Sequence, residues 1–294
     1  MEAAIDPGEF RDGQREAWNG AASGWRKWSP TIDAGTSAIT ERLVELAGVE
    51  AGSRVLDVAA GYGEPALTAA RRAGPDGSVV ATDISPDMIA YGRERAAQAG
   101  LENVEFVESA AASLDFPQGN FDAALSRWGI IFEPEAEAVA GRIRSFLKPG
   151  GRFAISSWGP PERVPMVALP MKIASEQLDV TLPPPGTPGP LSRPTPEALG
   201  GLLEAAGFSD VTVEEADVPL EWDSPEDFTT FNREIVPPLR AILAERPEEQ
   251  QERALSAITE AARASSGEAG EVRLSNLALL AVGRAGAAAR GRDV

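Results

Sequence analysis

A glycine-rich segment is the part of this sequence whose residue types and spacing best suit ligand chemistry. VLDVAAGYG (residues 55–63) is typical of a buried strand that runs into a glycine turn. Gly61 and Gly63 lack side chains, so a ligand can approach the backbone there, and a helix that follows would add free N–H groups. Asp83, twenty residues after Gly63, ends a second predicted strand. A carboxylate at that place can accept hydrogen bonds from both ribose hydroxyls of a nucleoside.

Two residue types with common catalytic roles are missing. The sequence contains no His and no Cys. This excludes Ser-His-Asp hydrolysis, His-ligated zinc or haem, thiolate nucleophiles and disulfides. Chemistry must therefore depend on carboxylates, Tyr, Lys, Arg, hydroxyls or a cofactor. If a general base is needed, the candidates are Tyr62, Glu64 or a carboxylate of the cap segments, and the sequence favours none of them.

The charge of the chain limits its partners. Its 294 residues include 27 Lys and Arg against 45 Asp and Glu, a net charge of −18. This predicts no nucleic-acid partner and no anionic lipid partner, because both need clustered cations. A neutral, apolar or cationic small molecule fits better. The sequence shows neither a signal peptide nor an apolar run long enough to span a membrane, so we expect a cytoplasmic protein, and its bias toward Arg over Lys favours a bacterial source.

Alternating strands and helices are expected around the glycine turn. The patterns predict strands at 53–61, 78–83, 104–109, 121–128 and 152–159, with helices at 64–74, 85–100 and 134–151. Such alternation indicates a parallel sheet with right-handed crossovers. Two further helices, 9–30 and 35–48, are predicted before the first strand.

The pattern changes after Gly159. A proline-rich stretch with one helix at about 165–178 precedes a helix at 196–207, a strand at 211–222, a helical insert and a last strand at 274–284. This order predicts an antiparallel hairpin of the last two strands. We therefore expect an α/β fold, a Rossmann-like doubly wound seven-stranded mostly parallel sheet with an antiparallel last strand and helical cap insertions. One domain would cover 1–294, with its core at about 35–160, 196–222 and 274–284, cap segments at 1–30, 160–194 and 224–267, and a loose tail at 285–294.

Four motifs in this order resemble those of class I S-adenosylmethionine-dependent methyltransferases, in the subgroup similar to ubiquinone/menaquinone-biosynthesis methyltransferases. VLDVAAGYG resembles the family pattern V-L-D-x-G/A-x-G-x-G, and VVATDISPDMI (79–89) resembles its second-strand motif with the ribose-binding acid. NFDAALSRWGIIF (120–132) resembles the fourth-strand motif, and LKPGGRFAISSW (147–158) the stretch that leads into the fifth strand. The resemblance covers about residues 53–160 closely.

The resemblance implies S-adenosyl-L-methionine as cofactor and S-adenosyl-L-homocysteine as product. It places Ala59, Gly61 and Gly63 around the methionine moiety, with Asp57 attracting the ammonium group. It implies that Asp83 binds the ribose and that Ile84 and Met88 lie on either side of the adenine. It further implies that the Ser126 carbonyl contacts the ammonium group and that Trp28 or Trp25 covers the cofactor. The loop residues Ala110 and Ala111 are the last implied cofactor contacts.

One position departs from the family pattern. The family usually has an Asp in the loop after the third strand, where it accepts a hydrogen bond from the adenine amino group, and Ala110 stands at that position here. The contact is lost unless Glu108 or Asp115 replaces it. One hydrogen bond contributes about 0.5–1.5 kcal/mol net. We therefore predict a cofactor affinity lowered by about tenfold, not abolished.

The hypothesis for function is methyl transfer to an O, N or C atom of a small, hydrophobic acceptor by direct in-line displacement. The cap segments would form the acceptor pocket over the carboxyl ends of the strands, with Trp25, Arg127 and Trp128 as substrate contacts. Alternatives are a cofactor-binding enzyme of non-methylating chemistry, such as a cyclase or pericyclase, and a non-catalytic cofactor-binding protein. An NAD-dependent oxidoreductase is a further alternative, because GYGEPA (61–66) also matches G-x-G-x-x-A. The sequence leaves a monomer and a homodimer equally open.

Overall fold

Seven strands form one sheet in the computed structural model, which describes residues 6–184, 186–267 and 270–286. They are β1 (Arg54–Val58), β2 (Ser78–Asp83), β3 (Val104–Glu108), β4 (Phe121–Arg127), β5 (Leu147–Trp158), β6 (Ser209–Trp222) and β7 (Val272–Arg284). Their order across the sheet is β3-β2-β1-β4-β5-β7-β6. The first five strands run parallel, and β7 is antiparallel to both β5 and β6. The predicted fold class is confirmed.

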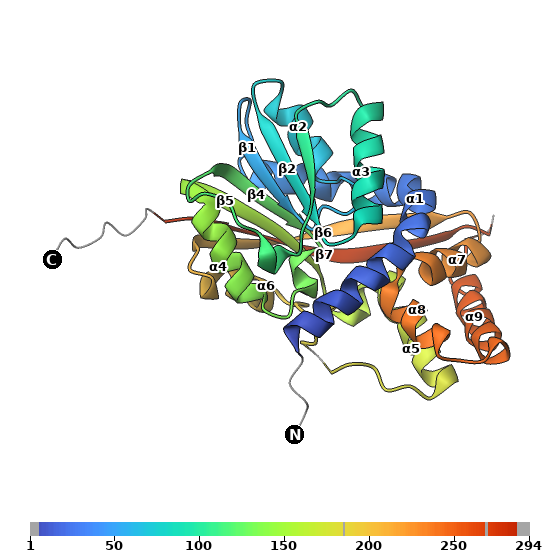
Figure 1. The fold of residues 1–294 in the computed structure, drawn as a ribbon. Coiled ribbons are helices and arrows are strands. Elements are labelled where there is room, and N and C mark those ends of the chain that lie inside the picture. Colours follow the sequence, from blue (N-terminus) through green and yellow to red (C-terminus); the bar gives the residue numbers. More distant parts are fainter. Residues whose placement is uncertain (1–5, 185, 268–269, 287–294) are drawn as a thin grey trace.

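Helices cover both faces of the sheet and extend beyond it. They are α1 (Pro7–Leu46), α2 (Ala66–Ala73), α3 (Pro86–Gln98), α4 (Ala136–Phe146), α5 (Pro165–Leu178), α6 (Pro196–Ala205), α7 (Pro225–Ile235), α8 (Pro237–Ala244) and α9 (Glu248–Arg263). One buried cluster joins the sheet to α1, α2 and α3, and a second joins it to α4 and α6. Figure 1 shows α5, α7, α8 and α9 gathered beside α1, where they build a helical cap.

The core strands are apolar throughout because both of their faces are covered. Val55 of β1 packs into the cluster with α1 to α3, and its neighbour Leu56 packs into the cluster with α4 and α6. Ala123 and Ala124 of β4 divide in the same way. Successive side chains of a strand point to opposite faces, so parallel strands between two helix layers give nearly continuous hydrophobic runs.

The first helix is longer than the sequence predicted. In place of two helices at 9–30 and 35–48, α1 runs unbroken for 40 residues with Pro30 inside it. Proline has no N–H, so the helix loses the bond to the carbonyl of Arg26. The Ser29 hydroxyl donates to that carbonyl at 3.1 Å and replaces the bond. Gly35 packs against the Pro219 carbonyl and Leu220, where a Cβ would collide, so this glycine serves close packing and does not end a helix.

Other predicted elements agree with the structure apart from their ends. The helix predicted at 134–151 stops at Phe146, and residues 147–151 already belong to β5. The reason is Pro149, which has no N–H and disfavours helical geometry at the residue before it. The helical insert at 224–267 consists of α7, α8 and α9. The tail predicted to be loose lies outside the described residues from residue 287 onward.

No helix of the described residues carries an apolar stretch long enough to cross a membrane.

Candidate functional site

One cavity lies where the carboxyl ends of the central strands meet α1 and the cap. Of the fourteen residues predicted from the sequence, ten line this cavity: Trp25, Ala59, Gly61, Asp83, Ile84, Met88, Ala110, Ala111, Arg127 and Trp128. The other four, which lie outside the lining, are Trp28, Asp57, Gly63 and Ser126. The structure therefore brings most of the residues chosen from separate motifs to one place.

The glycine turn between β1 and α2 presents backbone to the cavity. Gly61 has a φ of 53°, and a Cβ added to it would meet no atom within 4 Å. Gly63, with a φ of 110°, is closed in by Leu67, so its role is to let the turn pack. Ala59 also has a positive φ, 57°, which costs an L-residue about 1–2 kcal/mol. A ligand can approach the backbone closely at Gly61 but not at Gly63.

Asp83 is held in one orientation at the end of β2. Its Oδ2 accepts from the Gly61 N–H at 2.8 Å, and its Oδ1 accepts from the Ser85 N–H at 2.9 Å. Burial raises the pKa of Asp83 to about 6, against the effect of these N–H groups, which lower it. The carboxylate is thus ionised at neutral pH, and each oxygen keeps a lone pair that can accept from a ligand hydroxyl.

A second carboxylate lies within the wall beneath the glycine turn. Asp57 is completely buried in β1, and neither of its oxygens has a hydrogen-bond partner among the described residues. Burial raises its pKa well above the usual value, and the positive charge of Arg127 partly offsets that rise. Ser126, also buried, fixes the turn after β4, because its hydroxyl accepts from the Ile130 N–H at 3.0 Å.

The part of the cavity next to the loop after β3 is apolar and contains no acid from that loop. Ile84, Met88 and Ala110 line it, and Ala110 directly precedes a short 3-10 helix, Ala111–Ser113. Neither Glu108 nor Asp115 is among the residues that line the cavity. The Asp115 side chain is 91% exposed and lies 3.7 Å from Arg142. Neither residue therefore stands in for the missing acid, and the weakened cofactor affinity stays a prediction.

The first half of α1 covers the cavity. Arg11 and Trp18 line it together with Trp25. Arg11 donates to Glu133, after β4, and to Glu135, which ties the start of α1 to that loop. The sequence left Trp18, Trp25 and Trp28 open as residues that could line the site, and the structure brings Trp18 and Trp25, which are seven residues apart on one helix face, to the cavity.

Trp28 lies outside the cavity lining and contacts α7 of the cap. Its Nε1 donates to Glu234 at 2.6 Å, and its ring packs edge-on against Phe231. The structure therefore does not bring Trp28 to the place where it was expected to cover the cofactor. Trp18 and Trp25 cover that part of the cavity instead.

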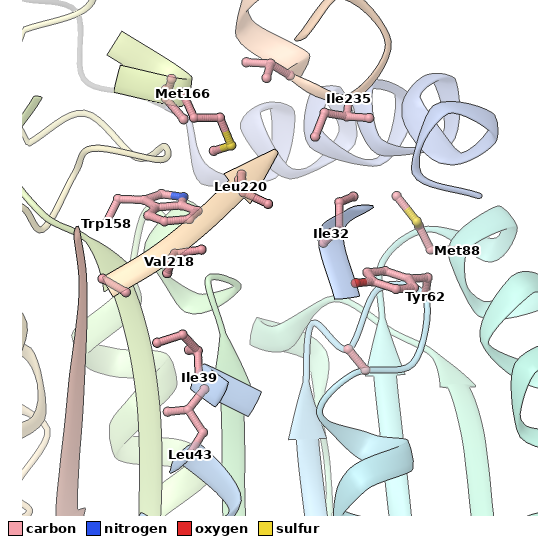
Figure 2. Close-up of a cluster of buried hydrophobic side chains, with 14 of the residues drawn as sticks. Ile32, Ile39, Leu43, Tyr62, Met88, Trp158, Met166, Val218, Leu220 and Ile235 are labelled. Atoms are coloured by element: carbon pink, nitrogen blue, oxygen red, sulfur yellow. The ribbon is translucent and has the colours of Figure 1, made fainter. Parts of the chain in front are cut away.

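The cap half of the cavity is aromatic and aliphatic. The Trp128 and Trp158 rings stack with centroids 4.3 Å apart, and Met166 lines the wall beside them. Figure 2 shows Trp158 on β5, Met166 on α5, Leu220 on β6 and Ile235 on α7, so four separate elements supply this wall. The sequence analysis did not predict Trp158, Met166, Leu220 or Ile235 as site residues, because only the folded chain brings them together.

Arg127 and Tyr62 form the polar part of the cap half of the cavity. The Arg127 guanidinium donates to Thr36 at 2.9 Å, to Thr40 at 2.7 Å and to the Tyr62 hydroxyl at 3.1 Å. The Tyr62 hydroxyl in turn donates to Asp33 at 2.8 Å. Burial raises the pKa of Tyr62, which leaves the hydroxyl protonated at neutral pH and makes it a poor general base.

Comparison with known proteins agrees with this geometry. A methyltransferase-domain family model matches residues 55–151. A ubiquinone/menaquinone biosynthesis C-methyltransferase (UbiE) of Ectopseudomonas oleovorans is 36% identical over 140 residues, which cover 47% of this chain and 82% of that protein. The chain belongs to the class I S-adenosylmethionine-dependent methyltransferases. A methyltransferase of the same name from Pseudomonas putida is 34% identical over 148 residues, which make up 50% of this chain and only 58% of that relative.

Solved structures place the fold in the same group. The phosphoethanolamine N-methyltransferase 2 of Haemonchus contortus, in complex with S-adenosylhomocysteine, aligns with a TM-score of 0.56 and 19% identity. The alignment covers 95% of this chain and 60% of the Haemonchus chain. At that identity the likeness concerns the fold, and the matched sequence motifs lie in the half that contains β1 to β5.

Proposed function

We propose that this methyltransferase transfers a methyl group from S-adenosylmethionine to an O, N or C atom of a small, apolar acceptor. The observation that carries the proposal is one continuous cavity with two chemically different ends. Gly61, Asp83 and Met88 line one end, and the aromatic cap lines the other. Two reactants bound at these ends would meet inside the cavity.

The residues of the first end fit the cofactor. Gly61 leaves the backbone open to a ligand, and Asp83 offers two oriented carboxylate oxygens to a pair of ribose hydroxyls. Asp57 adds an unpaired buried acid next to the glycine turn. S-adenosylmethionine carries an ammonium and a sulfonium, and buried carboxylates favour bound cations. The residues expected to hold the cofactor are Ala59, Gly61, Asp83, Ile84, Met88, Ala110 and Ala111. Asp57, which lies behind the cavity wall, would act on the ammonium group through its charge.

When bound, the cofactor supplies an already activated methyl group, so the protein needs mainly to orient an acceptor and exclude water. Alignment of two reactants can lower a barrier by about 7–11 kcal/mol. Trp25, Trp128 and Trp158 are placed to hold an apolar acceptor against the cofactor end. A protein that only orients the reactants needs no His or Cys, and this sequence contains neither. In this proposal the sheet core and its helical cap act as one methyltransferase domain.

The test is product mass. The protein is incubated with S-adenosylmethionine carrying a deuterated methyl group and with a panel of apolar aromatic acceptors that bear hydroxyl, amine or carboxylate groups. We expect S-adenosylhomocysteine to form together with a product that has gained the labelled methyl group. The matched control replaces S-adenosylmethionine with S-adenosylhomocysteine and should give no product.

Two results would contradict the proposal. One is failure of S-adenosylmethionine to bind at all. The other is binding without formation of S-adenosylhomocysteine in the presence of any acceptor, or with a product that is rearranged but unchanged in mass. The second result would revive the non-methylating alternatives.

A further inference from the structure

The cap half of the cavity contains a buried cation that no carboxylate contacts. Arg127 is 8% exposed and lines the cavity, and its three hydrogen bonds go to hydroxyl oxygens. The acids coupled to it through space are Glu64, Asp33 and the buried Asp57, and none of them forms an ion pair with it. Glu64 lies 3.6 Å from Arg71, and Asp33 lies 2.6 Å from Arg95. Within the described residues no ion pair includes Arg127.

An unpaired buried charge is costly, and Arg cannot escape the cost by losing its proton. Two of the five N–H groups of Arg127, one on Nε and one on Nη2, have no hydrogen-bond partner among the described residues. These two N–H groups can each donate a charge-assisted hydrogen bond to an anionic oxygen. Arg127 can therefore still donate two hydrogen bonds to an anionic group.

The surroundings of Arg127 would strengthen such an interaction. The Trp128 ring lies 5.6 Å from the guanidinium carbon, and Trp158 and Leu220 line the same cavity. Charge attraction is stronger in apolar surroundings than in water. One acid of the cavity lining, Glu133, is paired with Arg11. The overall charge of −18 suggested a neutral or cationic ligand, but Arg127 places a positive charge at this wall of the cavity.

We propose that Arg127 binds an anionic oxygen of the methyl acceptor, and that the acceptor is therefore an apolar ring or chain carrying a carboxylate, phenolate or enolate. This inference rests on the proposed function, since it names the class of acceptor for the same cavity. It assigns a charge to each end, with carboxylates at the cofactor end and a guanidinium at the acceptor end. A cationic acceptor, such as an amine, is disfavoured.

The test compares three small probes of nearly equal shape. Calorimetric titrations of the protein saturated with S-adenosylhomocysteine use 2-naphthoate, its neutral carboxamide and the corresponding naphthylmethylamine as probes. We expect the naphthoate to bind at least about tenfold more tightly than the carboxamide, and the amine to bind more weakly still. Equal binding of the three probes, tighter binding of the amine, or failure of the naphthoate to bind overturns the proposal.

Arg127→Met and Arg144→Met form a matched pair of variants. Arg144 is also partly buried, but it donates to the Ala206 carbonyl between α4 and α6, on the opposite face of the sheet. Arg127→Met should remove the preference for the naphthoate and keep S-adenosylhomocysteine binding, while Arg144→Met should change neither. If Arg127→Met does not fold, the probe series on the unchanged protein still decides the question.

The outcomes separate this inference from the proposed function. If S-adenosylhomocysteine does not bind the unchanged protein, the proposed function fails. If it binds and the three probes show no preference for the anion, only the assignment of Arg127 fails.

Discussion

The two ends of the cavity are built in different ways. The cofactor end comes from three consecutive units of chain, β1 with its glycine turn, β2 with Asp83, and the loop after β3. The acceptor end comes from α1, the end of β4, β5, β6 and the cap helices, which are far apart in the sequence. The first end needs a fixed backbone and two acids, whereas the second needs only apolar walls around one cation. The comparison teaches that local motifs encode the first end and tertiary packing creates the second.

The largest effect is expected from Asp83→Ala, which acts on the cofactor end alone. The variant loses two hydrogen bonds from a charged acceptor, each contributing about 1.5–3 kcal/mol, so affinity for S-adenosylmethionine should fall at least about 100-fold. Calorimetric titration measures the loss. Asp115→Ala is the matched control, because that carboxylate is 91% exposed and lies outside the cavity lining. A loss below tenfold for Asp83→Ala would mean that the two ends have been assigned wrongly.

The pH dependence of cofactor binding follows from the same carboxylate. The pKa of Asp83 is raised to about 6, so the residue is mostly ionised at pH 7 and mostly protonated at pH 5. Because only the ionised form offers acceptors on both oxygens, affinity should rise with pH and be about tenfold weaker at pH 5 than at pH 7. Titrations across this range test the prediction, with Asp83→Asn as a control expected to flatten the curve. A flat curve for the unchanged protein would contradict it.

Ala110→Asp restores the acid that the loop after β3 lacks. A new hydrogen bond to the adenine amino group should tighten S-adenosylmethionine binding by about three- to tenfold. Ser113→Asp adds the same charge to the exposed end of the neighbouring 3-10 helix and should leave affinity unchanged. Equal effects of the two variants would show that charge alone, and not an adenine contact, is responsible.

The smallest effect concerns the backbone at Ala59. Its φ of 57° suits glycine better than alanine, so Ala59→Gly should raise the free energy of unfolding by about 0.5–1 kcal/mol. Urea denaturation measures the change. Ala97→Gly, at an exposed position of α3, should instead destabilise the protein by about 0.5–1 kcal/mol. A destabilised Ala59→Gly would mean that the methyl group of Ala59 contributes packing that outweighs the strain.

The sequence predicted the sheet well because its signals are local. Apolar runs such as residues 53–61 and 78–83 reveal buried strands, and the strand–helix alternation determines their direction. The break expected before Gly35 was wrong, since the Ser29 hydroxyl replaces the backbone bond that Pro30 removes. Such compensation depends on a side-chain rotamer, which composition and periodicity do not reveal.

The site residues that could be predicted are likewise those fixed by local sequence motifs. Asp83 and Gly61 could be predicted because a short motif fixes both their spacing and their chemistry. Trp158, Met166 and Ile235 could not, since only packing of the cap against the sheet places them together. Arg127 was found from its motif as a substrate contact, but its lack of an ionic partner is visible only in the folded protein.

A crystal structure of this protein with S-adenosylhomocysteine tests the assignment of the cofactor end most directly. We expect the ribose hydroxyls within hydrogen-bonding distance of the Asp83 carboxylate, the adenine between Ile84 and Met88, and the sulfur facing the Trp25 and Trp128 side of the cavity. A ligand bound elsewhere, or bound here with its ribose away from Asp83, would contradict the central claim that the glycine turn and Asp83 form the cofactor end.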